Sequence, residues 1–180
     1  MFARTLPLLV AACAVLCGSA VAAPATTSAC VRGSWVASTA EANRLIHRIF
    51  ATRSNIQVER GSLVATFADG KLTYGGLSIV LVGSTGDVTV KQTVDLMSKA
   101  RYRVVGPRLV LGAGQYKLHY VNMVVTVSGR SKNGTPPADR TLATPGVAVP
   151  LTCSGRTLRW KVPLPAGTDG TWLTFQKERG

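Results

Sequence analysis

Alternation between apolar and polar residues is the feature of this sequence that most restricts its fold. It is clearest between Asp87 and Ser98, where most even-numbered positions are apolar and most odd-numbered positions are polar. Successive side chains of a β-strand point to opposite faces of the sheet, so this pattern predicts a strand with one dry and one wet face. The apolar positions are Val88, Val90, Val94 and Leu96.

Similar alternation runs through most of the chain. Turn sequences such as Asp69-Gly70 and Ser154-Gly155 separate neighbouring strands, and residues 131–139 form a polar, proline-containing loop. Many half-apolar strands with short turns predict a sandwich or a barrel. The predicted strands span residues 55–60, 62–68, 71–74, 77–82, 87–98, 100–105, 108–111, 116–128, 141–149, 157–162 and 171–177.

One segment has helical periodicity instead. Ser38-Thr39-Ala40-Glu41 has the pattern of a capping box at a helix N-terminus. The apolar residues that follow recur at intervals of three and four, which predicts an amphipathic helix lying on a larger core. A helix at a membrane surface is the alternative interpretation. The apolar residues are Ala42, Leu45, Ile46, Ile49 and Phe50.

The first 22 residues have the pattern of a secretory signal peptide. A short apolar run follows Arg4, and Ala20-Val21-Ala22 suits the cleavage site. Val10-Ala11-Ala12-Cys13 also resembles a bacterial lipobox, which would make Cys13 a lipidated N-terminus. We therefore expect a signal peptide over residues 1–22, a linker over 23–29 and one secreted domain over 30–180, with no later transmembrane segment.

Cleavage of the signal peptide would remove Cys13 and Cys17 and leave two cysteines. An even pair of cysteines in an exported protein predicts a disulfide, here between Cys30 and Cys153. The alternatives, a reactive thiol or a metal site, are disfavoured because only His47 and His119 could complete a set of soft ligands.

Two motifs at the ends of this domain carry a resemblance to a known family. The sequence C-V-R-G-S-W runs from Cys30 to Trp35, and L-T-C-S-G-R-T-L runs from Leu151 to Leu158. Their order and placement resemble the secreted lipocalin-like (calycin-type) proteins of actinobacteria, most of which are uncharacterised. The resemblance implies an all-β fold: an antiparallel up-and-down barrel of about 8–10 strands with one N-terminal amphipathic helix packed on it.

The resemblance also bears on how the barrel closes. Cys30 precedes the first expected strand and Cys153 lies in a closing hairpin, so a bridge between them would lock the seam. The family's last strand commonly ends with an arginine near the first-strand tryptophan, whereas here Lys177 is nearest, with Arg179 two residues on. A cation–π contact with Trp35 is one expectation, and Trp35 as a plain core aromatic is the other. Arg156 replaces the family's acidic turn residue.

No motif in the sequence indicates catalysis. The eight acidic residues are scattered, without a pair placed for glycoside hydrolysis, and neither a Gly-x-Ser-x-Gly elbow nor a His-Glu-x-x-His motif occurs. The two histidines are interpreted as structural. We expect a non-enzymatic protein, a monomer, with no cofactor and no metal.

Charge is the strongest remaining signal. The chain has 21 Lys and Arg against 8 Asp and Glu, a formal net charge of +13. The basic side chains form either the solvated outer face of the barrel or a site for anions, centred on Arg101, Arg103 and Arg108. Nucleic acid is disfavoured, because export removes the usual partner and no aromatic ladder accompanies the charges. The basic groups are Lys99, Arg101, Arg103, Arg108 and Lys117; Arg130, Lys132 and Arg140; and Arg156, Arg159 and Lys161.

Two functional hypotheses follow. In the first, the barrel interior binds a small, mostly apolar ligand; in the second, the protein associates with an anionic polymer, lipid or acidic protein of the cell envelope through its basic exterior. A host-directed inhibitor acting through residues 131–139 is a third idea. A cavity of several hundred Å³ would favour the first hypothesis and a filled interior the second. From the strand face on which each residue is expected to lie, we predict that the ligand site would be lined by Tyr102, Val104, His119, Val121, Met123, Leu158 and Trp160.

Overall fold

The computed structural model describes residues 28–49, 55–162 and 170–178. The predicted signal peptide, the lipobox with Cys13, most of the linker, Phe50 and Arg179 lie outside the described residues. The elements are α1 (Ser28–Val31), β1 (Gly33–Ala37), α2 (Thr39–Ile49), β2 (Gln57–Arg60), β3 (Leu63–Ala68), β4 (Lys71–Thr85), β5 (Val88–Val105), β6 (Arg108–Leu111), β7 (Gly114–Val127), β8 (Arg130–Gly134), β9 (Arg140–Thr144), β10 (Val147–Ser154), β11 (Thr157–Val162) and β12 (Thr171–Lys177).

Eight of these strands close into an antiparallel barrel. In order around the ring they are β1, β3, β4, β5, β6, β10, β11 and β12, and β12 pairs back onto β1. The strands of the ring therefore follow one another in the same order as in the sequence, and β2, β7, β8 and β9 lie outside the ring. The predicted all-β, up-and-down barrel with one N-terminal amphipathic helix is confirmed.

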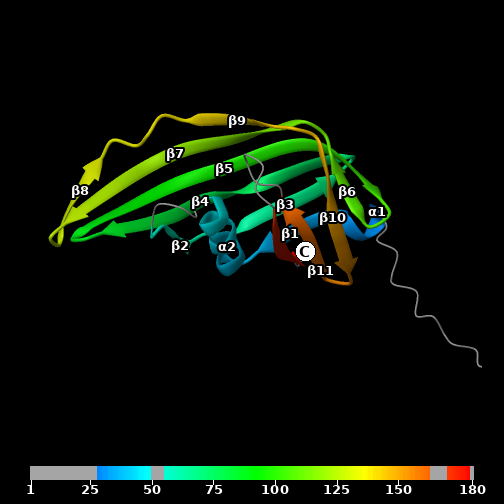
Figure 1. The fold of residues 1–180 in the computed structure, drawn as a ribbon, viewed down its shortest axis with the longest axis horizontal. Helices are drawn as coiled ribbons and strands as arrows, with labels where there is room; N and C mark the ends of the chain where they lie inside the picture. The colour runs from blue at the N-terminus through cyan, green and yellow to red at the C-terminus, as the bar shows by residue number, and fades with distance from the viewer. Residues whose placement is uncertain (1–27, 50–54, 163–169, 179–180) are drawn as a thin grey trace, which may run out of the picture.

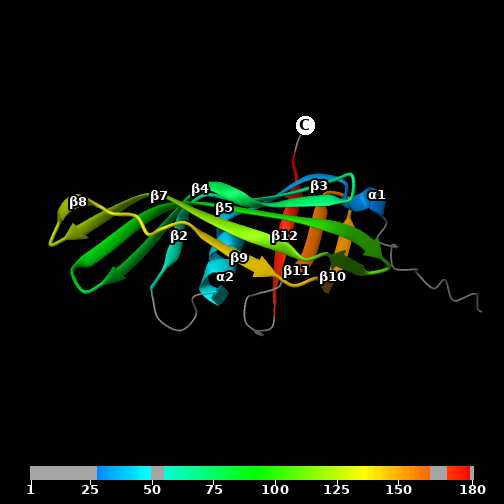
Figure 2. The same ribbon diagram turned by 90° about the horizontal axis from the view of Figure 1, so that it is seen from above.

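A second sheet extends from the barrel wall. We call β2, β4, β5, β7, β8 and β9 the long sheet. Figure 1 shows β4, β5 and β7 as long strands that form an arch with α2 beneath it, and Figure 2 shows the same strands from above. The barrel and the long sheet share β4 and β5, and the edge of β5 that faces away from β4 is divided between them. Its residues Val88–Lys99 pair with β7, and its residues Tyr102–Val105 pair with β6.

Two strands of the long sheet, β4 and β5, are longer than the sequence pattern predicts. Residues 71–82 form one strand because a bulge between Gly76 and Ile79 keeps β4 paired with β5, and Ser78 there has a φ of 51°. Gly75 is needed beside the bulge, because a Cβ atom would collide with the backbone of Leu96.

Two predicted segments differ from the structure near the proline-containing loop. Its beginning is not a loop, since Arg130–Gly134 forms β8 and pairs with β7. The predicted strand 141–149 is instead divided into β9 and β10 at Pro145-Gly146. Proline has no amide hydrogen to donate to a ladder, which accounts for the break.

Aromatic rings fill the interior of the barrel. Trp160 contacts Phe67, Tyr74 and Phe175 edge-on, with ring centroids 5.2–5.8 Å apart. Such geometry stabilises aromatic pairs beyond their burial. Large side chains that are fully buried around the cluster include Trp35, Leu63, Leu109, Leu151, Leu158 and Leu173.

The disulfide between Cys30 and Cys153 is confirmed, with Cα atoms 6.2 Å apart. The prediction that it joins the first and last strands is wrong. Cys30 lies in α1 and Cys153 in β10, and β11 and β12 separate β10 from β1 in the ring. The bridge therefore fastens the N-terminal helix to the barrel wall.

The seam itself is the pairing of β1 with β12. Trp35 lies opposite Lys177, whose Nζ is 5.4 Å from the centroid of the tryptophan ring. Trp35 is also fully buried, and its indole Nε1 donates to the carbonyl of Val31 at 2.7 Å. Trp35 is therefore both a buried core residue and the partner of Lys177 in a cation–π contact.

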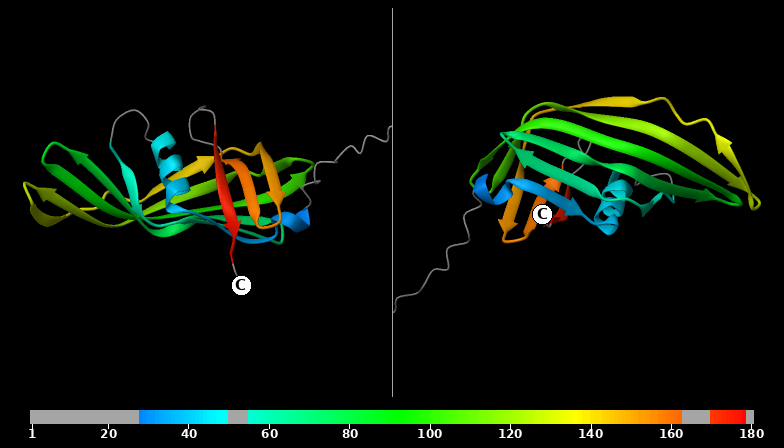
Figure 3. Two further views of the ribbon diagram at one scale, coloured as in Figure 1. Left: turned by 90° about the horizontal axis from the view of Figure 1, so that it is seen from below. Right: turned by 180° about the vertical axis from the view of Figure 1, so that it is seen from behind.

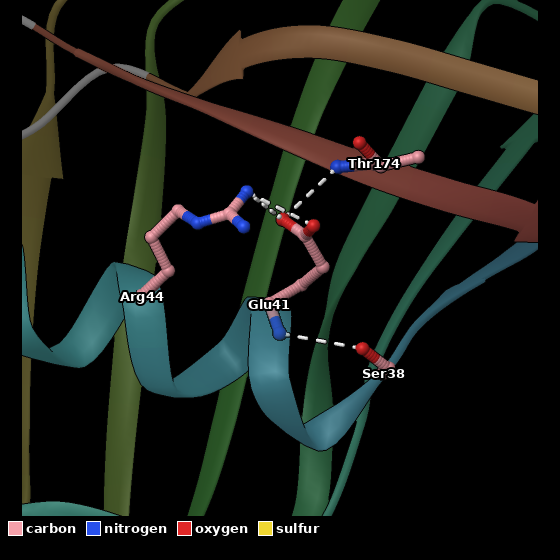
Figure 4. Close-up of polar contacts among 4 residues, drawn as sticks. All are labelled: Ser38, Glu41, Arg44 and Thr174. Atoms are coloured by element: carbon pink, nitrogen blue, oxygen red, sulfur yellow. Dashed lines mark hydrogen bonds and ion pairs between the residues drawn. The ribbon is translucent and has the colours of Figure 1, made fainter.

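The carboxylate of Glu41 links helix α2 to β12 (Figure 4). The backbone N–H of Glu41 donates to the Ser38 hydroxyl at 3.3 Å, as the predicted cap requires. The Glu41 carboxylate accepts from the backbone N–H of Thr174 at 3.2 Å and from Arg44 at 2.9 Å. Figure 3 shows α2 and β12 lying under the long strands. No described helix has the length and apolarity to cross a membrane.

We predict that Glu41→Ala lowers the free energy of unfolding by about 1–2 kcal/mol, because it leaves the Thr174 amide without its charged acceptor. Arg44→Ala is the matched control: it removes the same ion pair from its exposed side and should cost about 0.5 kcal/mol or less. Urea unfolding of both variants measures the difference. Equal losses would show that the contact to β12 contributes nothing.

Candidate functional site

Between the described residues, the barrel interior shows little free space. A slot of about 30 Å³ lies at one end of it, lined in part by Leu72, Tyr74 and Trp160. This is close to the share of volume that one water molecule has in the liquid. Pockets for drug-sized ligands are roughly ten times larger or more. The filled interior favours the second functional hypothesis over the first.

The residues predicted to line a ligand are divided between two places. Leu158 and Trp160 are buried in the barrel, and Tyr102 packs edge-on against Phe67 at 5.0 Å. Val104 is half-buried and packs against the same core. The other three, His119, Val121 and Met123, lie on β7 in the long sheet, outside the barrel.

The prediction that His119, Val121 and Met123 share a face is wrong. Thr93 and Val94 of β5 pair with Asn122 and Tyr120, so Val121 is an extra residue in β7. This bulge reverses the alternation, placing His119 and Met123 on opposite faces. Alternation has no clear phase in this segment, because apolar residues from Val121 to Val125 occur at both odd and even positions.

Six cations gather on the outer, convex face of β4, β5, β6 and β7. Alternate residues of β5 share a face, so its three cations stand about 6.6 Å apart in a row. Lys71 on β4 lies directly opposite Arg101, and Lys117 on β7 lies directly opposite Met97. All six side chains are exposed. We call this set the basic strip: Lys71, Lys99, Arg101, Arg103, Arg108 and Lys117.

Sequence reasoning found five of these six. It missed Lys71, which is far along the chain from the others but meets Arg101 through the pairing of β4 with β5. The Asp69-Gly70 turn fixes where β4 begins, but the partner of β4 depends on the whole ring. The position of Lys71 beside Arg101 therefore depends on the register between β4 and β5, which the local sequence around Lys71 does not determine.

The basic strip has no carboxylate partners among the described residues. The ion pairs found among the described residues are Arg44–Glu41, Lys91–Glu59 and His119–Asp139, and none of them includes a member of the strip. Like charges directly opposite each other across two strands are destabilising, as in the pair Lys71 and Arg101. An unneutralised row of cations attracts anions from solution.

The other basic groups predicted from the sequence do not join the strip. Arg130 and Lys132 lie on β8, which pairs with the end of β7 farthest from the barrel. Arg159 lies on β11, three strands from β5 around the ring, with its guanidinium 5.6 Å from the Trp172 ring centroid. The strip is therefore the place where the fold concentrates charge from several strands.

His119 and Asp139 border the strip. The imidazole Nδ1 is 2.9 Å from Oδ2 of Asp139, and Oδ1 of the same carboxylate accepts from the backbone N–H of Tyr120. The hydrogen bond with Asp139 raises the pKa of His119, and the same bond lowers the pKa of Asp139. Both side chains are exposed. Within the described ranges, no cluster of histidine, cysteine and carboxylate side chains could hold a metal ion.

We predict that Asp139→Asn lowers the pKa of His119, because it removes the carboxylate that favours the imidazolium. A raised folded-state pKa means that the contribution of His119 to stability is complete below its unfolded pKa of about 6.5 and disappears as pH rises through the folded value. NMR titration of the His119 ring signals measures the shift. Glu59→Gln is the control, and an unchanged His119 pKa in Asp139→Asn would contradict the geometry.

Comparisons with protein-family models, curated proteins and solved structures found no significant match to this chain.

Proposed function

We propose that this chain is an exported binding protein that holds an anionic polymer of the cell envelope on its basic strip. The observation that carries the proposal is the row of six exposed cations without carboxylate partners among the described residues. The opposed pair of Lys71 and Arg101 is the strongest part of it, because this arrangement lowers stability unless an anion lies between the two charges.

The spacing of the strip suits a polymer. Its cations come from strands rather than loops, so their separations are fixed by the β-ladder. Arginine binds phosphate with two parallel hydrogen bonds, and lysine binds it as a point charge. A chain with a phosphate in every repeat, such as poly(glycerol phosphate), could satisfy several cations at once.

The rest of the structure supports a role for the exterior. The interior slot of about 30 Å³ is too small for the apolar ligand of the first hypothesis. The disulfide between Cys30 and Cys153 is typical of exported proteins. Membership in the lipocalin-like family, the absence of enzymatic activity and the monomeric state stay predictions.

We predict that Lys71→Gln/Arg101→Gln weakens binding of fluorescein-labelled poly(glycerol phosphate) by about tenfold or more, at roughly 1 kcal/mol for each cation near an anionic surface. Fluorescence anisotropy at several salt concentrations measures the affinity, which should fall steeply as salt screens the charges.

The matched control is Arg130→Gln/Lys132→Gln, which removes the same charge from the far end of the long sheet. It should change the affinity by less than about twofold, allowing only for screened long-range attraction. Urea unfolding should show that Lys71→Gln/Arg101→Gln is no less stable than the natural protein, since it relieves repulsion. Equal effects of the two double variants, or binding that ignores salt, would refute the proposal.

A further inference from the structure

A groove crosses the outer face of the long sheet, beyond the end of the basic strip. Its volume of about 270 Å³ is near the lower limit of small-molecule pockets, roughly 300 Å³. The β5 residues of the groove are odd-numbered, like those of the basic strip, so both sets lie on the same face of that strand. We call it the cross-strand groove, and among the residues that line it are Glu59, Arg60, Val80, Lys91, Thr93 and Asn122.

The register between strands places four of these residues in one row. Arg60 of β2 lies opposite Val80 of β4. Val80 lies opposite Thr93 of β5, which in turn lies opposite Asn122 of β7. Neighbouring strands are about 4.8 Å apart, so the row is about 14 Å long. Val80 is only 8% exposed, whereas the side chains at both ends of the row are exposed. The row is therefore a trough with an aliphatic floor between a cation and an amide.

Two β-bulges turn polar side chains into the groove. On β2 the register shift makes Glu59 an extra residue, and its carboxylate reaches across β4 to within 2.9 Å of the Lys91 Nζ. On β7 the extra residue is Val121, and the reversal of alternation there puts Asn122 on the outer face. Bulges often re-aim side chains next to functional sites, and here they do so on both sides of one groove.

Three polar side chains of the groove are free to bind a ligand. Within the described ranges, the guanidinium of Arg60 has no carboxylate partner, and the side chains of Thr93 and Asn122 make no hydrogen bond. Lys91, by contrast, is held by its ion pair with Glu59. The groove therefore offers one unpaired cation, together with a hydroxyl and an amide that can each donate and accept hydrogen bonds.

The groove is distinct from the basic strip. Thr93 and Lys99 are about 20 Å apart along β5, and Asp95 lies between them on the same face. His119 lies opposite Asp95 and is bonded to the carboxylate of Asp139. These two carboxylates would repel an anionic polymer that continued from the strip into the groove. The groove and the strip are therefore separate sites.

The chemistry of the groove selects the kind of ligand. The guanidinium of Arg60 can bind a carboxylate or a phosphate with two parallel hydrogen bonds. The amide of Asn122 and the hydroxyl of Thr93 both donate and accept, as the hydroxyl groups of a sugar do. The aliphatic floor at Val80 suits the C–H groups of a ring. A small ring that carries several hydroxyls and one acidic group satisfies all of these side chains at once.

We propose that the cross-strand groove binds a monosaccharide with one acidic group, which Arg60 holds while Thr93 and Asn122 bind the ring hydroxyls. The acidic group is a carboxylate or a phosphate, since Arg60 would bind either in the same way. The proposal does not rest on the polymer proposal, because no residue of the basic strip takes part in it.

The test is an NMR titration of the ¹⁵N-labelled, disulfide-bonded protein with glucuronate and with glucose 6-phosphate. Glucose, which lacks the acidic group, and cyclohexanecarboxylate, which lacks the hydroxyls, are the controls. We expect at least one probe to give saturable shifts of the Thr93 backbone amide and the Asn122 side-chain amide. Both controls should bind about fivefold more weakly or worse, since each loses hydrogen bonds that the probes make. The tighter-binding probe identifies the acidic group.

Arg60→Gln removes the unpaired cation from an exposed position on the edge strand β2, so the variant should fold normally. Its affinity for the tighter-binding probe should fall by about tenfold, because a charge-assisted hydrogen-bond pair is lost. Thr93→Val keeps the shape of the side chain and should weaken binding by about threefold. Arg103→Gln is the matched control: it removes the same charge from the basic strip and should change the affinity by less than about twofold.

Each of three results would overturn the proposal. The first is the absence of saturable shifts at Thr93 and Asn122 with either probe. The second is binding of cyclohexanecarboxylate as tight as that of glucuronate, as expected if exposed cations merely attract any anion. The third is an equal loss of affinity in Arg60→Gln and Arg103→Gln, which would show that net charge rather than the groove determines binding.

Discussion

The structure depends on the double use of one strand, β5. With 18 residues, β5 is longer than the barrel wall needs, and the two halves of one of its edges pair with different strands, β7 and β6. One half closes the ring through β6, while the other carries β7 and the long sheet away from it. Because backbone N–H and C=O groups must be paired when buried, this division fixes where the barrel ends and where the arch begins.

The basic strip and the interior slot both follow from that division. On the outside, the odd-numbered residues of β5 run along the convex face, so Lys99, Arg101 and Arg103 align with cations on neighbouring strands. On the inside, the separation of β6 from β7 leaves the slot beside Tyr74 and Trp160. The same strand thus presents charge to solvent on one face and apolar surface to the core on the other.

Local patterns predicted the architecture, and long-range pairing decided the details. Alternation from Asp87, the cap at Ser38 and the pair of cysteines were sufficient for a disulfide-bonded barrel with a helix, because each depends on neighbouring residues or on composition. The bulge at Val121 and the meeting of Lys71 with Arg101 were not predictable, since they depend on the register between strands. The route of the disulfide was missed for the same reason: only the ring order shows that β11 and β12 lie between.

The shared strand can be tested directly by cross-strand backbone NOEs in the folded protein. The account predicts NOEs from Gln92 to both Leu81 and Met123, and from Val104 to Leu109, because β5 has these partners in its two halves. NOEs from only one half of β5, with the other half unpaired on that edge, would contradict the closed barrel with its projecting sheet, and with it the position of the basic strip.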